Sequence, residues 1–183
     1  NSAGTGLDLA MRVLDVGPGD EVITTPLTFV ATAHCIVGTG ATLVFADIDP
    51  QTYNLDPAKV EEKITPQTKA VIPVHMCGMP ANIDAFDDLA QRTGVKIVYD
   101  AAHAVGTLYK GRPVGPAGDM SVYSFQTNKN MTTLGEGGMV TTDNETYHKR
   151  LQRIKSFGFE YGEVDDVLEW GTNYRMTKIQ SAV

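Results

Sequence analysis

Short β-rich runs alternate with helical stretches along most of this chain. β-Branched and aromatic residues gather at 22–25, 43–45, 70–73, 96–99, 120–124 and 138–142, and apolar residues recur with helical spacing at 7–14, 31–37, 57–64, 83–91 and 145–157. Strands that are separated by helices pair mostly in parallel, and the helices then cover both faces of the sheet. The alternation therefore predicts an α/β fold with a mostly parallel, mixed sheet.

Length and composition fit a single globular domain. The 183 residues are 42% hydrophobic and 20% charged, and the formal net charge is -7. This charge argues against nucleic acid as a partner, and no apolar stretch approaches the roughly 20 residues that a membrane-spanning helix needs. The two cysteines, Cys35 and Cys77, lack a paired C-x-x-C spacing, so we expect reduced thiols in the core of a cytoplasmic protein.

Lys129 lies in an irregular segment between the β-rich runs at 120–124 and 138–142. Such a segment follows a strand end, where open α/β folds build their sites. The neighbours of this lysine carry little charge, and a desolvated amine has the lowered pKa that a nucleophile needs. Two interpretations stay open at this point, a catalytic lysine and a solvated loop lysine.

Asp100 follows the β-rich run at 96–99 directly. An acid at the end of a buried strand needs a partner, and it can either cap a following helix or balance a cationic ring nitrogen. In enzymes that use pyridoxal 5'-phosphate (PLP), a lysine holds the cofactor as a Schiff base and an acid keeps the pyridine nitrogen protonated. Asp100 and Lys129 together supply both groups.

A turn of small residues at 3–6 opens the first helical stretch. It does not meet the dinucleotide-binding fingerprint, because Leu9 stands where the third glycine is required and no strand precedes the turn in this chain. Free amides at the start of a helix suit a phosphate group, which makes Gly4 and Thr5 candidate contacts. An ordinary helix cap explains the same residues.

A metal site is not predicted. His75, Cys77 and His103 are possible ligands, but their spacing does not repeat as it does in known zinc patterns.

Several motifs occur in an order that resembles a known family. They are Gly-Pro-Gly-Asp-Glu-Val at 17–22, Thr-Phe-Val-Ala-Thr at 28–32, Asp-Ala-Ala-His at 100–103, Ser124 followed by Lys129, Gly-Glu-Gly-Gly at 135–138 and Asn-Tyr-Arg-Met at 173–176. The set resembles the DegT/DnrJ/EryC1/StrS aminotransferases, PLP-dependent enzymes that act on keto-sugars. The resemblance implies the large PLP-binding domain of a fold type I transferase. Residues 1–183 are then expected to be a fragment, with an N-terminal segment and a C-terminal small domain outside it.

The resemblance also implies roles for individual residues. Lys129 binds the cofactor and moves protons, and Asp100 pairs with the ring nitrogen. The further cofactor-binding residues are Gly4 and Thr5 at the phosphate, with the register across 3–5 left open, Phe29 stacked on the ring, His103 near the phenolic oxygen, Ser124 at the phosphate, and Asn173 reaching the phosphate of a neighbouring subunit. The last role implies a homodimer with shared active sites.

The activity implied is transfer of an amino group from an amino acid, glutamate by resemblance, to a keto-sugar that is linked to a nucleotide. Sugar dehydratases of the same family carry histidine in place of Lys129, so transamination is favoured. Two alternatives stay open: a non-catalytic PLP-fold protein that serves as a binding or regulatory subunit, and another fold type I PLP enzyme that acts on amino acids.

Overall fold

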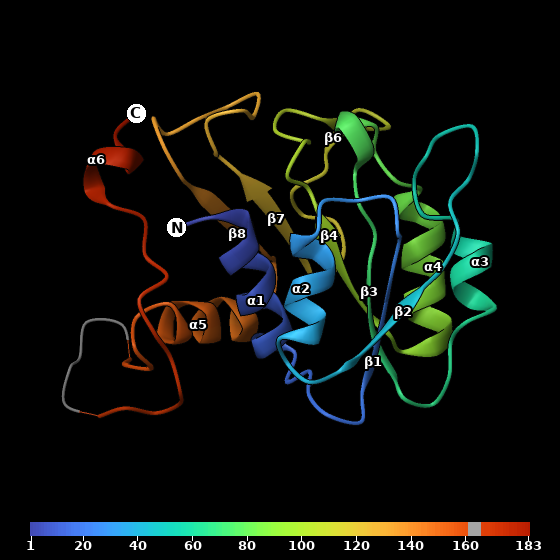
Figure 1. The fold of residues 1–183 in the computed structure, drawn as a ribbon, viewed down its shortest axis with the longest axis horizontal. Helices are drawn as coiled ribbons and strands as arrows, with labels where there is room; N and C mark the ends of the chain where they lie inside the picture. Colours follow the sequence, from blue (N-terminus) through green and yellow to red (C-terminus); the bar gives the residue numbers. More distant parts are fainter. Residues whose placement is uncertain (161–165) are drawn as a thin grey trace.

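Six strands form one sheet at the centre of the computed structural model, which describes residues 1–160 and 166–183 (Figure 1). The order of the strands across the sheet is β2-β1-β3-β4-β7-β8. Their bounds are β1 Glu21–Thr24, β2 Thr42–Phe45, β3 Thr68–Ile72, β4 Lys96–Asp100, β7 Met120–Ser124 and β8 Gly138–Thr141. Neighbouring strands are parallel except for β7 and β8. The predicted α/β fold with a mostly parallel, mixed sheet is confirmed.

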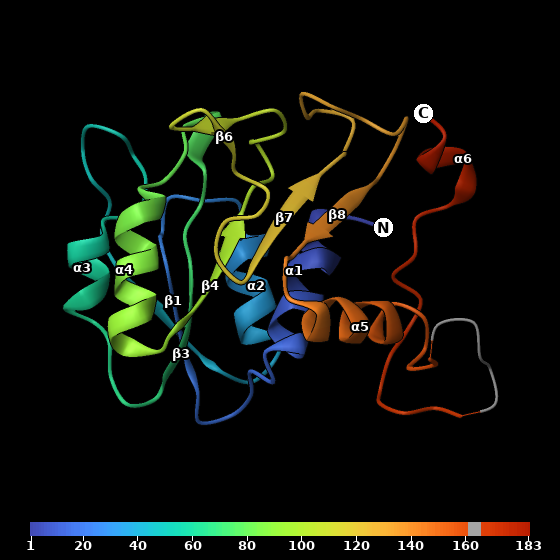
Figure 2. The ribbon, with the colours of Figure 1, turned by 180° about the vertical axis from the view of Figure 1, so that it is seen from behind.

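Helices cover both faces of this sheet. Their bounds are α1 Ala3–Val13, α2 Ala31–Val37, α3 Pro57–Glu61, α4 Ile83–Thr93, α5 Glu145–Ile154 and α6 Lys178–Ser181, with a short 3-10 turn, η1, at Met76–Gly78. The apolar residues of α1, α2 and α5 pack on one face with Val22 of β1, and those of α3 and α4 pack on the other face with Ile23. Consecutive residues of a strand point to opposite faces, which explains this division. Figure 2 shows α3 and α4 side by side, away from α1, α2 and α5. None of the described helices has both the length and the apolar character needed to cross a membrane.

Local sequence signals set the ends of α4. The side chain of Asn82 accepts a hydrogen bond from the backbone N of Ala85, and Gly94 ends the helix with a φ of 80°. Asn is a preferred N-cap, and glycine adopts this left-handed conformation without a steric penalty. Phe86 and Leu89 lie three residues apart and are both buried against the sheet. The predicted helix at 83–91 is therefore present and two residues longer.

α1 begins earlier than the predicted stretch at 7–14 because Ser2 caps it. The Ser2 hydroxyl accepts a hydrogen bond from the backbone N of Thr5 at 3.2 Å, and the Thr5 hydroxyl accepts one from the backbone N of Ser2 at 3.1 Å. This reciprocal pair is a capping box, which satisfies amides that a helix start leaves free. The first turn of the helix is thereby fixed in place.

A small hairpin was not predicted. β5 (Leu108–Tyr109) and β6 (Arg112–Pro113) pair in antiparallel fashion in a stretch for which the sequence predicts no strand. The two connecting residues, Lys110 and Gly111, have φ values of 50° and 80°. Two positive φ values are typical of the type I' turn that joins short antiparallel strands.

The core position predicted for Cys77 is wrong. Cys35 is buried in α2 as predicted, but Cys77 is exposed in η1 and its φ is 51°. A residue in this left-handed conformation sits in a turn, and the turn carries its side chain away from the sheet. The thiol lies instead beside the site described below.

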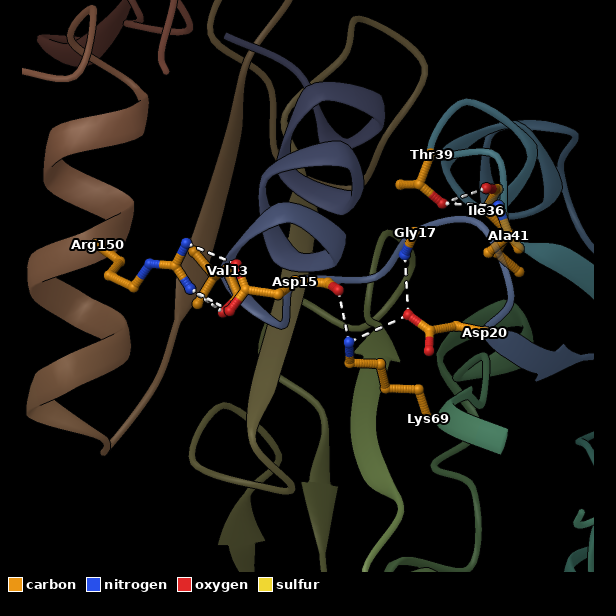
Figure 3. Close-up of polar contacts among 9 residues, drawn as sticks. All are labelled: Val13, Asp15, Gly17, Asp20, Ile36, Thr39, Ala41, Lys69 and Arg150. Atoms are coloured by element: carbon orange, nitrogen blue, oxygen red, sulfur yellow. Dashed lines mark hydrogen bonds and ion pairs between the residues drawn. The ribbon is translucent and has the colours of Figure 1, made fainter. Parts of the chain in front are cut away.

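Contacts at the amino-terminal edge of the sheet hold the far end of α1 (Figure 3). Arg150 of α5 donates to the carbonyl oxygen of Val13 at 2.8 Å and to both carboxylate oxygens of Asp15 at 2.9 Å. Lys69 of β3 donates to the carbonyl oxygen of Asp15 at 2.5 Å and to Asp20 Oδ2 at 3.1 Å. These bonds fix the end of α1 that is opposite Ser2, so the helix points its amino terminus at the carboxyl edge of the sheet.

Candidate functional site

A cavity of about 710 Å³ opens at the carboxyl edge of the parallel strands. In doubly wound sheets this edge is where ligands bind. The start of α1 meets the segments that follow β1, β3, β4 and β7 at this edge. The wall is formed by Leu27, Thr28 and Phe29 after β1, Val74 and Met76 after β3, Asp100, Ala102 and His103 at the end of β4, Ser124, Gln126, Asn128, Lys129 and Glu136 between β7 and β8, and Ser2, Ala3, Gly4, Leu7 and Ala31 from the helices.

Asp100 is the buried acid of this cavity, with 5% of its surface exposed. Its Oδ2 accepts a hydrogen bond from Thr32 Oγ1 at 2.8 Å, and its Oδ1 accepts one from the backbone N of Ala102 at 3.1 Å. No helix follows it, so it is not a helix cap. No lysine, arginine or histidine nitrogen lies within 4.0 Å of its carboxylate in residues 1–160 and 166–183. A buried carboxylate without a cation is costly, and the open cavity beside it leaves room for one.

Lys129 lines the same cavity from the segment after β7. Its backbone N donates to the carbonyl oxygen of Gln126 at 2.9 Å, and the Gln126 side chain accepts from the backbone N of Asn128 at 2.8 Å. Asn130 Nδ2 donates to the carbonyl oxygen of Val105 at 3.3 Å. These bonds hold the turn, and across the described ranges no carboxylate forms an ion pair with the Lys129 amine.

His103 lines the same cavity and is close enough to Asp100 and Lys129 to feel both charges. Burial lowers the pKa of its imidazole, the positive charge of Lys129 lowers it further, and the charge of Asp100 opposes both. The ring is therefore mainly neutral at pH 7. Its Nδ1 is shielded from solvent and has no hydrogen-bond partner within the part of the chain that the structure describes. A buried polar atom without a hydrogen-bond partner is uncommon in folded proteins.

The start of α1 lies against the opposite wall. Ser2, Ala3 and Gly4 line the cavity, whereas Thr5 lines a second cavity of about 460 Å³ between α1, β8 and α5. The backbone N–H groups of Ala3 and Gly4 precede the helical hydrogen bonds, and no acceptor for them lies among the described residues. Of the two registers left open for the phosphate, Ala3 with Gly4 faces this cavity and Thr5 does not.

Gly138 makes this approach of α1 possible. A Cβ atom added to Gly138 would lie 2.4 Å from the carbonyl carbon of Ser2 and 2.7 Å from the backbone N of Ala3. These separations are far below van der Waals contact, so only glycine allows β8 and the start of α1 to touch. The start of α1 and the segment that carries Lys129 are thus joined at one point.

Two further predicted residues lie in the wall. Ser124, at the end of β7, is buried, and its Oγ accepts a hydrogen bond from the backbone N of Gln126 at 3.4 Å. Phe29 lies on the loop between β1 and α2 with 72% of its surface exposed. An aromatic ring this exposed at a cavity mouth has a free face on which a flat ligand can stack.

Asn173 is the second predicted residue, besides Thr5, that lies outside the cavity. It is exposed, and its Oδ1 accepts hydrogen bonds from the backbone N and Nε of Arg175 at 3.2 and 3.1 Å. It does not cap a helix, because Thr177 caps α6. The chain therefore brings together Gly4, Phe29, Asp100, His103, Ser124 and Lys129, and leaves Thr5 and Asn173 apart.

A small opening of about 310 Å³ on the outer side of Lys129 contains the exposed thiol. Its lining residues are Cys77, His103, Asn128, Lys129 and Asn130. No three His, Cys, Asp or Glu side chains of the described ranges are grouped so that they can hold a metal ion. The charged and titratable side chains that line the larger cavity are the Lys129 amine, the Asp100 and Glu136 carboxylates and the His103 imidazole.

Sequence reasoning missed three residues that shape the site: Ser2, Thr32 and Gln126. Ser2 is three residues before Thr5, a capping spacing that can be read from the sequence. Thr32 carries no such signal, because its partner Asp100 is 68 residues away in the sequence. The Gln126 turn has no such signal, because it depends on the path of the backbone.

Comparison with known proteins gives a consistent result. The profile of the DegT/DnrJ/EryC1/StrS aminotransferase family matches residues 1–183. Spore coat polysaccharide biosynthesis protein SpsC of Bacillus subtilis is 50% identical over 158 residues, 86% of this chain and 40% of SpsC. GDP-perosamine synthase of Caulobacter vibrioides is 42% identical over 183 residues, 100% of this chain and 49% of the synthase.

A solved structure has the same fold. The crystal structure of NtdA from Bacillus subtilis with bound cofactor PMP is 32% identical and superposes with a TM-score of 0.92, covering 99% of this chain and 41% of NtdA. The chain spans about half the length of the curated relatives it matches.

Proposed function

Because the chain belongs to the DegT/DnrJ/EryC1/StrS aminotransferase family, whose members depend on PLP, we propose that it is the large PLP-binding domain of a sugar aminotransferase. The reaction is transfer of an amino group from an amino acid, for which glutamate is our choice, to a keto-sugar linked to a nucleotide. The name GDP-perosamine synthase supports a nucleotide-linked substrate. The unpaired cysteines favour a cytoplasmic enzyme.

The observation that carries this proposal is the unpaired carboxylate of Asp100. PLP supplies an electron sink when its ring nitrogen is protonated, and that nitrogen is the cation that the buried acid lacks. The amides of Ala3 and Gly4 fit a phosphate at the other end of the cavity, since helix starts favour anions. The residues present therefore fit the cofactor.

The other residues take roles that follow from their places in the wall. The Lys129 amine bonds the cofactor and afterwards acts as the base that carries the proton between carbon atoms. Neutral His103 offers a ring nitrogen to the phenolic oxygen of the cofactor. Ser124 contributes a hydroxyl to the phosphate, and Phe29 covers one face of the ring.

We also propose a homodimer in which Asn173 serves the neighbouring subunit. This residue is exposed and lies outside the cavity of its own chain. An exposed amide that is held by Arg175 is well placed for a ligand beyond its own subunit. The smaller partners are the amino acid donor and the keto-sugar acceptor.

The test uses the full-length protein, PLP and the variant Lys129→Ala. Wild-type protein should show a visible absorption band that borohydride removes, leaving a mass adduct on Lys129. Lys129→Ala should lose the band, the adduct and at least a thousandfold of activity, because no other group replaces a covalent amine. Lys110→Ala, at a well-exposed lysine, is the matched control and should behave as wild type.

Failure of wild-type protein to give a band or an adduct would reject the enzyme and favour a binding or regulatory subunit. A band on wild type with transamination of free keto acids alone would instead favour an enzyme of amino acids. Keto-sugars linked to nucleotides, offered with glutamate, separate these outcomes.

A further inference from the structure

A chain of two threonine hydroxyls leads from the cavity wall to the buried acid. Thr28 Oγ1 and Thr32 Oγ1 are 2.8 Å apart, and Thr32 Oγ1 is 2.8 Å from Asp100 Oδ2. Thr28 lines the cavity, whereas Thr32 is 0% exposed inside the start of α2. The two partners of Thr32 come from different parts of the chain, since Thr32 and Asp100 are 68 residues apart.

The donors and acceptors on these side chains fix the direction of both hydrogen bonds. An ionised carboxylate only accepts hydrogen bonds, so Thr32 donates its hydroxyl hydrogen to Asp100. The Thr32 oxygen is then free to accept, and Thr28 donates to it. Thr28 therefore turns its hydrogen inward and presents only oxygen lone pairs to the cavity.

The carboxylate of Asp100 is held on two sides by this arrangement. Thr32 occupies one lone pair of Oδ2, and the backbone N of Ala102 occupies one lone pair of Oδ1. Two bonds from different directions set both the position and the plane of a carboxylate. The lone pairs that remain are the ones available to a cation in the cavity.

We propose that Thr32 is a positioning residue that orients Asp100 for the cofactor, and that Thr28 orients Thr32. This inference rests on the proposed function. Neither threonine needs to move a proton or touch the reacting atoms. Their contribution is that the carboxylate is already aligned when the ring nitrogen arrives, so no binding energy is spent on ordering it.

The alternative is that Thr32 only satisfies a buried hydroxyl and stabilises the fold. Thr24 offers a matched control for this alternative. It is equally buried, and its Oγ1 donates to the carbonyl oxygen of Ile72 at 2.8 Å, without lining the cavity. Replacing Thr24 by valine removes a buried hydrogen bond of similar length that does not end on Asp100.

The experiment compares Thr32→Val, Thr32→Ser and Thr24→Val in the full-length protein. It measures the PLP dissociation constant, the visible absorption of bound PLP and the Tm of the PLP-free protein. Thr32→Val should raise the dissociation constant about tenfold, as loss of a hydrogen bond to a charged group predicts, and should reduce the visible band. Thr32→Ser should restore both to within about threefold of wild type, because the hydroxyl is kept.

Thr24→Val should lower the Tm and leave PLP binding and the absorption band unchanged. Thr32→Val with wild-type PLP affinity and spectrum would overturn the inference, even if its Tm falls. If Thr32→Val does not fold, Thr28→Val on the surface loop tests the inference in its place. About threefold weaker PLP binding by this variant supports the two linked hydroxyl hydrogen bonds. Unchanged PLP binding and an unchanged spectrum overturn the inference. Wild-type protein without a Lys129-dependent band would reject the proposed function itself, which is a separate result.

Discussion

At the scale of single residues, a buried polar atom without a hydrogen-bond partner marks a position where activity or stability is sensitive to mutation or pH. His75 is 0% exposed, and its Nδ1 accepts a hydrogen bond from the backbone N of Ala81 at 3.0 Å. Its Nε2 has no partner in the described ranges, and its ring stacks on Tyr99 with centroids 4.7 Å apart. Burial lowers the pKa of His75 from its ordinary value of 6.5 to about 4.

This depressed pKa predicts a loss of stability in mild acid. Between pH 6.5 and 4 the unfolded chain binds a proton at His75 that the folded chain does not, so the free energy of unfolding falls as the pH falls through this window. The loss approaches ~1.4 kcal/mol per pH unit. Urea unfolding at pH 7, 6 and 5 measures it.

His75→Asn keeps an acceptor for Ala81 and should flatten the pH dependence relative to wild type. The exposed His34 provides the control, and His34→Asn should keep the wild-type slope. Equal slopes for His75→Asn and wild type would contradict the assignment.

The sequence revealed the two charged centres of the site but not their surroundings. Asp100 and Lys129 were predicted because each follows a strand end, and parallel strand ends meet at one edge. The unpaired state of Asp100 and its bond to Thr32 were not predictable, because they depend on contacts between residues 68 apart. Thr5 is the opposite case. Its place at the start of a helix suggested a contact with a phosphate, but in the structure its hydroxyl takes part in the capping box.

At the scale of secondary-structure elements, the contact of β8 with the start of α1 is the most sensitive feature. A methyl group on Gly138 would meet the backbone of Ser2 and Ala3, and backbone atoms cannot rotate away. Gly138→Ala should therefore lower the free energy of unfolding by about 1–3 kcal/mol and the Tm by about 3–10 °C. It should also weaken PLP binding, because the amides of Ala3 and Gly4 shift.

Gly135 in the same motif is the control for this prediction. A Cβ atom there meets only the Gln180 Nε2 atom, at 3.5 Å, which is an ordinary contact. Gly135→Ala should keep the Tm within about 2 °C of wild type. Calorimetry of both variants tests the difference, and a Gly138→Ala protein as stable as Gly135→Ala would refute it.

Element types were predictable from the sequence where periodicity was strong, and their ends were predictable only in part. The helix at 31–37 and the strand at 120–124 have the predicted bounds. α5 ends at Ile154 rather than at 157, and Phe157 has a φ of 63° that no helix contains. The β5–β6 hairpin was missed because two residues per strand are too few for a period to appear.

At the scale of the whole molecule, the proposed homodimer with a shared Asn173 predicts a specific result when two inactive variants are mixed. Lys129→Ala and Asn173→Ala should each be strongly impaired alone. When the two variants are mixed in equal amounts and reassembled, half of the dimers are hybrids, and each hybrid has one intact site out of two. The mixture should therefore recover about a quarter of wild-type activity. Activity assays before and after mixing, with size-exclusion chromatography of the mixture, test this.

A mixture without recovery would mean that Asn173 serves its own chain, because each site of a hybrid would then lack one of the two residues. Wild-type protein that elutes as a monomer and is active would reject the shared site altogether.

The cavity wall has parts of two kinds. Asp100 and Ser124 stand at strand ends, and the amides of Ala3 and Gly4 belong to a capped helix that is fastened at both ends. Leu27 and Met76 come from connecting segments outside the strands. Substitutions at these two positions reshape the cavity, while the acid at the strand end and the amides at the helix start keep their places.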